Sequence, residues 1–221
     1  GHGAAIGGCI IDGGNFDWGN GRFLEMTEPY APFHGMKFWE EFGPSALAMR
    51  MRAEAMRDLG AAMSPHNAFL ILQGIETLSL RMTQHVANAH ELMNWLLEQE
   101  NVSWVNHPDL DTNATNDVAQ RLFPKGAGSM VCFGIEGGRV AGAAFIDALQ
   151  LGSNLANVGD SRTLVLHPGS TTHSRLSPEQ MVAAGISEDM IRVSVGIESI
   201  KDIKADFSNG LRAAKRAVEA S

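Results

Sequence analysis

From residue 100 onward, short apolar runs that fit buried strands alternate with segments of helical periodicity. Side chains alternate faces along a strand but repeat every 3.6 residues along a helix, so the two patterns are distinguishable. Their alternation is typical of an α/β or α+β lobe in which helices pack on a sheet. The expected strands are 102–105, 129–135, 163–166 and 191–195, and the expected helices are 109–121, 140–149 and 199–219.

The first hundred residues are organised differently. The run 7–11 is apolar and bounded by glycines, which predicts a buried strand. Residues 12–37 are rich in Gly, Asn, Pro and aromatic side chains and show no periodicity, so we expect them to shape a site or a subunit contact. A helix is expected over 46–59, and Ser64–Pro65 has the residue types of an N-cap followed by a first helical position.

Helical character then continues to Gln99. Val86, Ala89, Met93 and Leu96 recur at spacings of three and four residues, which predicts one buried stripe. A helix of this length without strong internal caps often joins two domains. We therefore expect the stretch 64–99 to be a bridging helix, with Gly74 as the candidate position for an interruption or kink.

Composition narrows the classes of partner. The 221 residues carry a formal net charge of −8, and an acidic chain of this kind is not expected to bind nucleic acid or an anionic membrane. Cys9 and Cys132 both stand in apolar runs, where buried free thiols are the ordinary interpretation. Free thiols favour an intracellular, cytoplasmic location.

Arg192 is the most informative charged residue. It stands inside the apolar segment 190–198, and a guanidinium in such a segment is costly unless a carboxylate or phosphate pairs with it. It could clamp a substrate carboxylate in a bidentate manner. The alternative is an edge-strand arginine that points to solvent or pairs with a nearby glutamate, and the pattern alone leaves both open.

Polar side chains also gather on either side of the expected strand 163–166. The segments 154–160 and 167–173 are rich in Asn, Asp, Ser, Thr and His, as residues that line a polar pocket would be. A loop satisfied by its own turn hydrogen bonds is the alternative. No His or Cys pair with the spacing of a metal site supports His167 or His173 as ligands, so no metal is expected.

Together these segments resemble the pyridoxal-phosphate (PLP) enzymes of cysteine and methionine metabolism, and most closely the sulfhydrylase branch. The similarity runs in order along essentially the whole chain, and its most specific parts are the Gln-Gly-x-Glu-Thr-Leu stretch from residue 73 and the Arg-x-Ser-x-Gly-x-Glu stretch from residue 192. The residues that carry the resemblance lie in the segments 1–8, 12–18, 57–65, 73–82, 157–160, 167–173 and 192–198.

The resemblance implies an α/β fold, the type I fold of PLP-dependent transferases. Residues 1–80 would form the C-terminal part of the large PLP domain with the start of the bridging helix. Residues 81–221 would form the smaller C-terminal α/β domain. The Schiff-base lysine of the family is expected just upstream of Gly1, so no catalytic residue is expected within the chain.

The resemblance assigns substrate-side roles to a few residues. Arg192 matches the arginine that binds the α-carboxylate of the amino-acid substrate, and Asn157 stands where related lyases place a serine that assists it. Ser170, Thr171 and Thr172 would lie behind them, near the mouth of the cofactor site.

The implied reaction is γ-replacement, in which sulfide replaces the acetate of O-acetyl-L-homoserine to give homocysteine. Sister enzymes of the same fold, of the cystathionine γ-synthase or methionine γ-lyase type, are the alternative. A non-catalytic fragment with an interaction role is a further alternative. The family implies PLP as cofactor, an amino-acid ester and sulfide as substrates, and a homotetramer built as a dimer of dimers.

Overall fold

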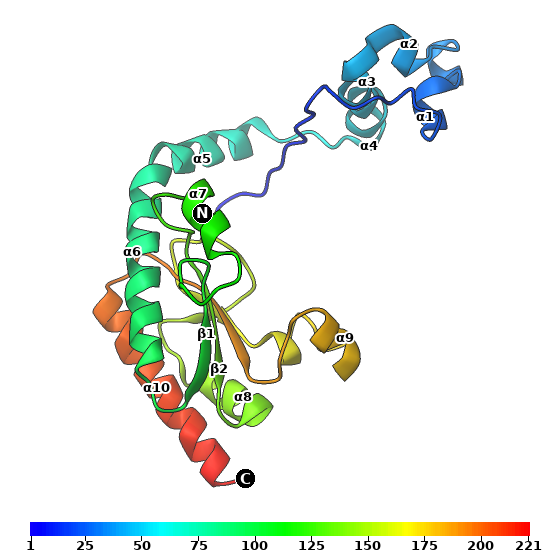
Figure 1. The fold of residues 1–221 in the computed structure, drawn as a ribbon. Helices are drawn as coiled ribbons and strands as arrows, with labels where there is room; N and C mark the ends of the chain where they lie inside the picture. The colour runs from blue at the N-terminus through cyan, green and yellow to red at the C-terminus, as the bar shows by residue number, and fades with distance from the viewer. The chain divides into compact units, whose positions relative to one another are not determined.

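The computed structural model describes residues 1–221, which form two compact units (Figure 1). One unit comprises Gly74–Ser221 together with Gly1–Gly3, and the other comprises Ala4–Gln73. The assignment of residues 1–80 and 81–221 to a large and a small domain stays a prediction.

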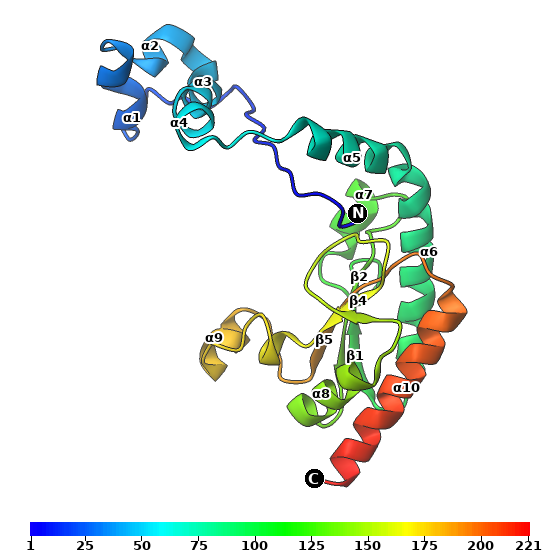
Figure 2. The ribbon, with the colours of Figure 1, turned by 180° about the vertical axis from the view of Figure 1, so that it is seen from behind.

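A mixed five-stranded sheet organises the larger unit, with strand order β1-β2-β5-β4-β3. Neighbouring strands run antiparallel except β3 and β4, which are parallel. This order places β5 in the centre, with a hydrogen-bonded strand on either side (Figure 2). The strands are β1 Val102–Asn106, β2 Met130–Ile135, β3 Ser153–Asn154, β4 Leu164–Leu166 and β5 Met190–Ser194.

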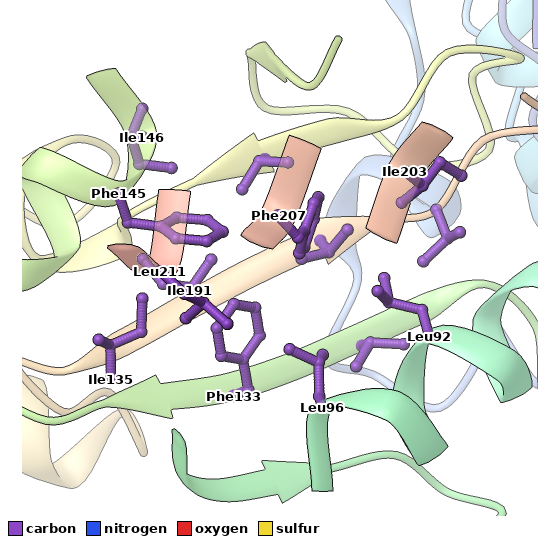
Figure 3. Close-up of a cluster of buried hydrophobic side chains, with 14 of the residues drawn as sticks. Leu92, Leu96, Phe133, Ile135, Phe145, Ile146, Ile191, Ile203, Phe207 and Leu211 are labelled. Atoms are coloured by element: carbon purple, nitrogen blue, oxygen red, sulfur yellow. The ribbon is translucent and has the colours of Figure 1, made fainter. Parts of the chain in front are cut away.

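Helices α6 (Leu78–Leu97), α8 (Gly138–Ala148) and α10 (Ile200–Glu219) pack on one face of this sheet. Ile191 and Val193 point to that face from β5, because alternate residues of a strand share a face. Figure 3 shows the resulting apolar core, to which the three helices and the central strands all contribute. The remaining helices of this unit are α7 Asn116–Leu122, η4 Pro168–Ser170 and α9 Pro178–Ala183.

Three aromatic rings form the centre of the core. Phe145 of α8 meets Phe207 of α10 edge to face at a centroid distance of 5.3 Å, and Phe133 of β2 meets Phe145 edge to face at 5.7 Å (Figure 3). All three side chains are fully buried. Such pairs add to the stabilisation from burial and fix the spacing between helix and sheet. The other face of the sheet carries Arg192 together with its register partners Cys132 and Leu166.

The Ala4–Gln73 unit is built from short helical pieces around Met26, Phe38 and Ala46. The Arg50 guanidinium lies over the rings of Tyr30 (4.8 Å) and Phe38 (5.3 Å). Its pieces are α1 Leu24–Thr27, η1 Ala31–Phe33, α2 Phe38–Phe42, η2 Gly43–Ser45, α3 Ala46–Met51, a π-helical turn Arg52–Met56 and α4 Arg57–Leu59. Helix α5, Pro65–Glu76, begins in this unit and ends three residues beyond it. Short helices of this kind depend on aromatic and cation–π packing, since their own propensity is too weak.

Several predicted elements are confirmed. The expected strands after residue 100 match β1, β2, β4 and β5, and the expected helices 140–149 and 199–219 match α8 and α10. Ser64 caps α5, since its Oγ accepts the N–H of Asn67 at 3.1 Å. The stretch 64–99 forms α5 and α6 with a break at Thr77. Within 109–121, α7 begins only at Asn116.

The buried strand predicted at 7–11 is wrong. No strand forms there, and Ile10 and Ile11 are 67% and 89% exposed. An apolar run indicates burial only when a partner strand or helix covers it, and no element of the described unit does so. The predicted burial of Cys9 is wrong for the same reason, because Cys9 is exposed; Cys132 is half-buried, and both cysteines are free.

Candidate functional site

Arg192 lies in the middle of the central strand. Its register partners are Cys132 on β2 and Leu166 on β4, so these three side chains share the face of the sheet opposite the helices. The side chain is half-buried and forms no salt bridge within the chain. The alternative of an edge-strand arginine paired with a glutamate is therefore wrong, and an unpaired guanidinium stands on this face.

The other motif residues after Arg192 have structural roles. The Ser194 Oγ accepts the N–H of Gly159 at 3.0 Å. The Glu198 carboxylate accepts the N–H of Thr163 at 2.6 Å and its hydroxyl at 2.8 Å. The same hydroxyl accepts the N–H of Gly196 at 3.0 Å. The pattern Arg-x-Ser-x-Gly-x-Glu thus ties the end of β5 to the chain around β4 and leaves only the arginine unbound.

A glycine is required at position 196 because two backbone segments lie very close together there. A Cβ atom there would lie 2.4 Å from the backbone nitrogen of Thr163 and 2.5 Å from the carbonyl carbon of Arg162. Backbone atoms cannot turn away as a flexible side chain can. The glycine therefore allows the segment after β5 to lie against residues 162–163.

The 157–160 loop is attached to the same strand. Gly159 is bound by Ser194, which follows Arg192 by two positions and shares its face. Asn157, two residues earlier, is exposed, and its Oδ1 accepts the N–H of Val158 at 2.9 Å. This leaves the amide N–H₂ of Asn157 free. The fold therefore brings the Asn157 loop and Arg192 to one face of the sheet.

Asp160 closes that loop from inside. It is 2% exposed and accepts the backbone N–H of Arg162 at 3.1 Å. Burial by itself raises the pKa of the Asp160 carboxyl, but the hydrogen bonds and positive charge of Arg162 outweigh burial and lower it. Asp160 is thus ionised at neutral pH and stabilises the turn; it does not compete for Arg192.

Ser170, Thr171 and Thr172 follow β4 on η4 and the turn after it. The Ser170 hydroxyl hydrogen-bonds to Nδ1 of His167 at 2.9 Å, and the Thr171 hydroxyl donates to the His167 carbonyl at 2.7 Å. The Thr172 hydroxyl hydrogen-bonds to Nδ1 of its neighbour His173 at 2.8 Å. These bonds are local, as the turn interpretation predicts, and no hydrogen bond joins the three residues to Arg192.

Cys132, the register partner of Arg192 on β2, has an ionisable side chain. Burial raises the pKa of the Cys132 thiol, and the Arg192 guanidinium opposes that rise. The thiol is therefore neutral near pH 7. A neutral thiol does not form an ion pair with Arg192 and does not compete with an external anion for it.

The sequence patterns did not indicate two buried polar residues of α6, His85 and Asn88. The His85 ring donates from Nδ1 to the Val195 carbonyl at 2.6 Å. Asn88 donates to the carbonyls of Gly196 and Glu198 at 3.0 and 2.9 Å. Both hold the segment after β5 against the helix, and their spacing of three residues on one helical face was the available signal. The expected stripe instead counted Val86, which is only half-buried.

A large open hollow of this unit lies elsewhere. Its volume is about 750 Å³, and residues of α10 and of the 98–101 turn line it. It contains none of the residues described above. The size of a hollow therefore does not lead to the face of the sheet that carries Arg192.

Comparison with known proteins places these features in a family. Residues 1–212 match the family model of the Cys/Met metabolism PLP-dependent enzymes. The chain belongs to this family. It is 48% identical over 211 residues to O-acetyl-L-homoserine sulfhydrylase 1 of Thermus thermophilus, an alignment that covers 96% of this chain and 50% of that protein. The chain thus spans about half the length of the curated relatives it matches.

Solved structures of family members confirm the type I fold. An O-acetylhomoserine (thiol)-lyase structure from Campylobacter jejuni, which carries pyridoxyl-lysine, superposes with a TM-score of 0.80 at 34% identity, covering 86% of this chain and 45% of that one. A cystathionine gamma synthase structure from Xanthomonas oryzae gives 0.67 at 38% identity, covering 72% and 41%. PLP is the cofactor of the family, and its named relatives are enzymes. None of this chain's helices is long and apolar enough to cross a membrane.

The residues on the Arg192 face fit one part of a PLP site. A half-buried guanidinium without an internal carboxylate suits the carboxylate of an amino acid held by the cofactor. The lysines of the chain stand at positions 37, 125, 201, 204 and 215. None of these lies on a strand of the sheet, and the last three belong to α10, on the opposite face. The described face thus carries an unpaired guanidinium and no lysine.

Proposed function

We propose that this chain supplies the substrate-carboxylate site of a PLP-dependent enzyme that replaces the acetate of O-acetyl-L-homoserine with sulfide. The observation that carries the proposal is Arg192, an unpaired guanidinium on the central strand of the sheet. The similarity to named sulfhydrylases supports the choice of reaction.

Arg192 would bind the α-carboxylate through two parallel N–H···O bonds. A bidentate pair fixes orientation as well as position, so the bond that loses its proton is held in one direction relative to the cofactor. PLP supplies the electron sink for removal of the α and β protons when it is bound. The chain's own contribution is binding and orientation.

The surrounding residues would keep this arginine ready. Ser194 fixes the 157–160 loop beside it, and the free amide N–H₂ of Asn157 is the expected second donor to the carboxylate. Cys132 stays neutral and Asp160 stays paired with Arg162, so neither neutralises the guanidinium. Ser170, Thr171 and Thr172 remain proposed support behind the site.

A second candidate is a cystathionine γ-synthase type reaction, favoured by the 38% identity to the Xanthomonas oryzae enzyme. The two candidates differ in the nucleophile that attacks the γ-carbon. The sulfhydrylase uses sulfide and yields homocysteine, whereas the synthase uses cysteine and yields cystathionine. Products formed with each nucleophile from O-acetyl- and O-succinyl-homoserine therefore separate the candidates.

We expect homocysteine from O-acetyl-L-homoserine and sulfide to exceed cystathionine from the same ester and cysteine by at least about tenfold in kcat/KM. The converse ratio would support the synthase.

The visible spectrum before and after borohydride tests whether the protein is a PLP enzyme at all. A yellow band that borohydride bleaches irreversibly shows cofactor bound to lysine. A colourless protein that gains no band with added PLP would favour a non-catalytic fragment.

We also propose the family's cytoplasmic location and its assembly as a dimer of dimers. Exposed apolar side chains such as Ile6 (90%) and Ile11 (89%) support further burial of the Ala4–Gln73 unit by other polypeptide. The molar mass in solution, measured by light scattering during gel filtration, checks the assembly.

A further inference from the structure

We propose that His90, His107 and Asp109 form a binding site for a divalent transition metal of the zinc type, separate from the Arg192 face. One ligand atom from each residue lies within 4.8 Å of the other two. Two imidazoles and one carboxylate are a donor set that zinc accepts in proteins. The proposal does not depend on the reaction proposed above.

The present hydrogen bonds define where the ion would lie. The His90 Nε2 is 2.7 Å from Asp109 Oδ2, and the His107 Nδ1 is 3.8 Å from the same oxygen. Neighbouring ligands of a tetrahedral zinc ion with bonds of about 2.0–2.1 Å are roughly 3.3 Å apart. The first distance must widen and the second must shorten by about half an ångström each. The ligand atoms of the two histidines, which lie within 4.8 Å of each other, must approach by up to about 1.5 Å.

One buried polar atom of this cluster lacks a partner. Asp109 Oδ1 makes no hydrogen bond, although the Asp109 side chain is only 8% exposed. Unpartnered buried groups of this kind are rare in a folded protein. The second carboxylate oxygen of Asp109 is thus available to a cation, in addition to Oδ2, which already accepts the N–H of Ala127 at 2.8 Å.

Two hydrogen bonds of the cluster would change on metal binding. The ion would replace the hydrogen bond between His90 Nε2 and Asp109 Oδ2, which now measures 2.7 Å. It would also compete with the Asp109 N–H, 3.1 Å away, for the His107 Nδ1 lone pair.

An open hollow of about 470 Å³ gives access to the cluster. His90 and Asp109 line it, together with Gln120, Lys125 and other residues. Three protein ligands leave a fourth position for water or an anion. The positive charge of Lys125 on the same hollow favours a small anion at that position over a second cation.

Cobalt(II) titration of the tag-free, chelator-treated protein tests the proposal. Tetrahedral cobalt absorbs strongly in the visible region, and zinc should displace it at one ion per chain. The His90→Gln variant removes one ligand at a position whose side chain is 39% exposed, so the fold should persist. We expect it to weaken zinc binding by more than about 100-fold, since loss of a group behind a ligand already costs about 10–100-fold.

His66→Gln, at an exposed histidine of α5, is the matched control and should leave the zinc affinity unchanged. Far-UV circular dichroism checks that both variants are folded. The proposal is overturned if the protein shows no saturable cobalt band up to about millimolar metal, or if His90→Gln binds zinc as tightly as the parent.

Discussion

At the scale of single residues, Arg192 has no partner within the chain, whereas the other side chains of its motif form hydrogen bonds. Arg192 makes no salt bridge, whereas Ser194 and Glu198 each bind backbone N–H groups of other segments. A charged side chain on a central strand is stabilised by an anion from outside the chain. The residues next to it must keep the nearby loops in a fixed position for that anion to bind. Substitutions at these positions should therefore have different kinetic signatures.

Ser194→Ala removes the acceptor of the Gly159 N–H and loosens the Asn157 loop. We expect the KM for the amino-acid ester to rise about two- to tenfold, the equivalent of one hydrogen bond, with a smaller change in kcat. Steady-state kinetics with the ester as varied substrate measure the split. Ser79→Ala, at an exposed position on α6, is the control. Equal losses in both variants would contradict a positioning role for Ser194.

Gly196→Ala tests the close backbone approach. The added methyl group would meet the backbone of residues 162–163 at 2.4–2.5 Å, so the free energy of unfolding should fall by about 1–3 kcal/mol. Urea denaturation measures the change. Gly8→Ala, where nothing lies within 4 Å of the added carbon, should change stability by less than about 0.5 kcal/mol. Unchanged stability of the Gly196 variant would refute the packing described here.

At the scale of elements, the buried face of α6 binds the helix to the sheet. Leu96 is fully buried, whereas its neighbour Leu97 is 55% exposed. Leu96→Ala should lower the free energy of unfolding by about 2–5 kcal/mol, because it leaves a cavity in the core. Leu97→Ala should stay within about 0.5 kcal/mol of the parent. Similar costs for both, measured by urea denaturation, would mean that the face of α6 is wrongly assigned.

Asp189 joins the start of β5 to β1. Its Oδ2 accepts the Trp104 indole N–H at 2.9 Å and the Ser103 hydroxyl at 3.1 Å. Burial raises the pKa of Asp189, but these hydrogen bonds and that from Ser187 prevail and lower it. A carboxyl with a lowered folded-state pKa stabilises the protein above its unfolded-state pKa of about 3.9 and loses that contribution as the pH falls through the folded-state value.

The stability difference between the parent and Asp189→Asn should therefore be largest near pH 7 and shrink below about pH 4. Urea denaturation between pH 7 and pH 2.5 measures it. A difference that grows on acidification would have the opposite sign and would show that burial dominates the pKa of this carboxyl.

The elements that sequence predicted well are those whose pattern reports burial directly. β2 and β5 alternate apolar side chains toward one face, and α10 repeats them at helical spacing, so period and length were enough. The strand predicted at 7–11 failed because pairing depends on a partner element, which no local pattern encodes. β3, two residues long, and the capped helix α9 are too short for periodicity to reveal.

At the scale of the whole molecule, the candidate site was predictable in part. The sequence showed Arg192 as a charged residue in an apolar strand. That this strand is the central one became known only from the strand order of the folded sheet. The spacing of His85 and Asn88 could place both on one helical face, but the distant backbone groups that they and Asp109 bind could not be read from the sequence. Resemblance to a family supplied the reaction, which physical reasoning about the residues alone left open.

The most direct test is the kinetics of homocysteine formation from O-acetyl-L-homoserine and sulfide by the parent, Arg192→Ala and Arg212→Ala proteins. Arg212 is an exposed arginine of α10 and matches the lost charge. We expect Arg192→Ala to lower kcat/KM by about 10–150-fold, the loss of a charge-assisted hydrogen bond, and Arg212→Ala to leave it unchanged. Full activity in the Arg192→Ala protein would contradict the carboxylate site on which the proposed function rests.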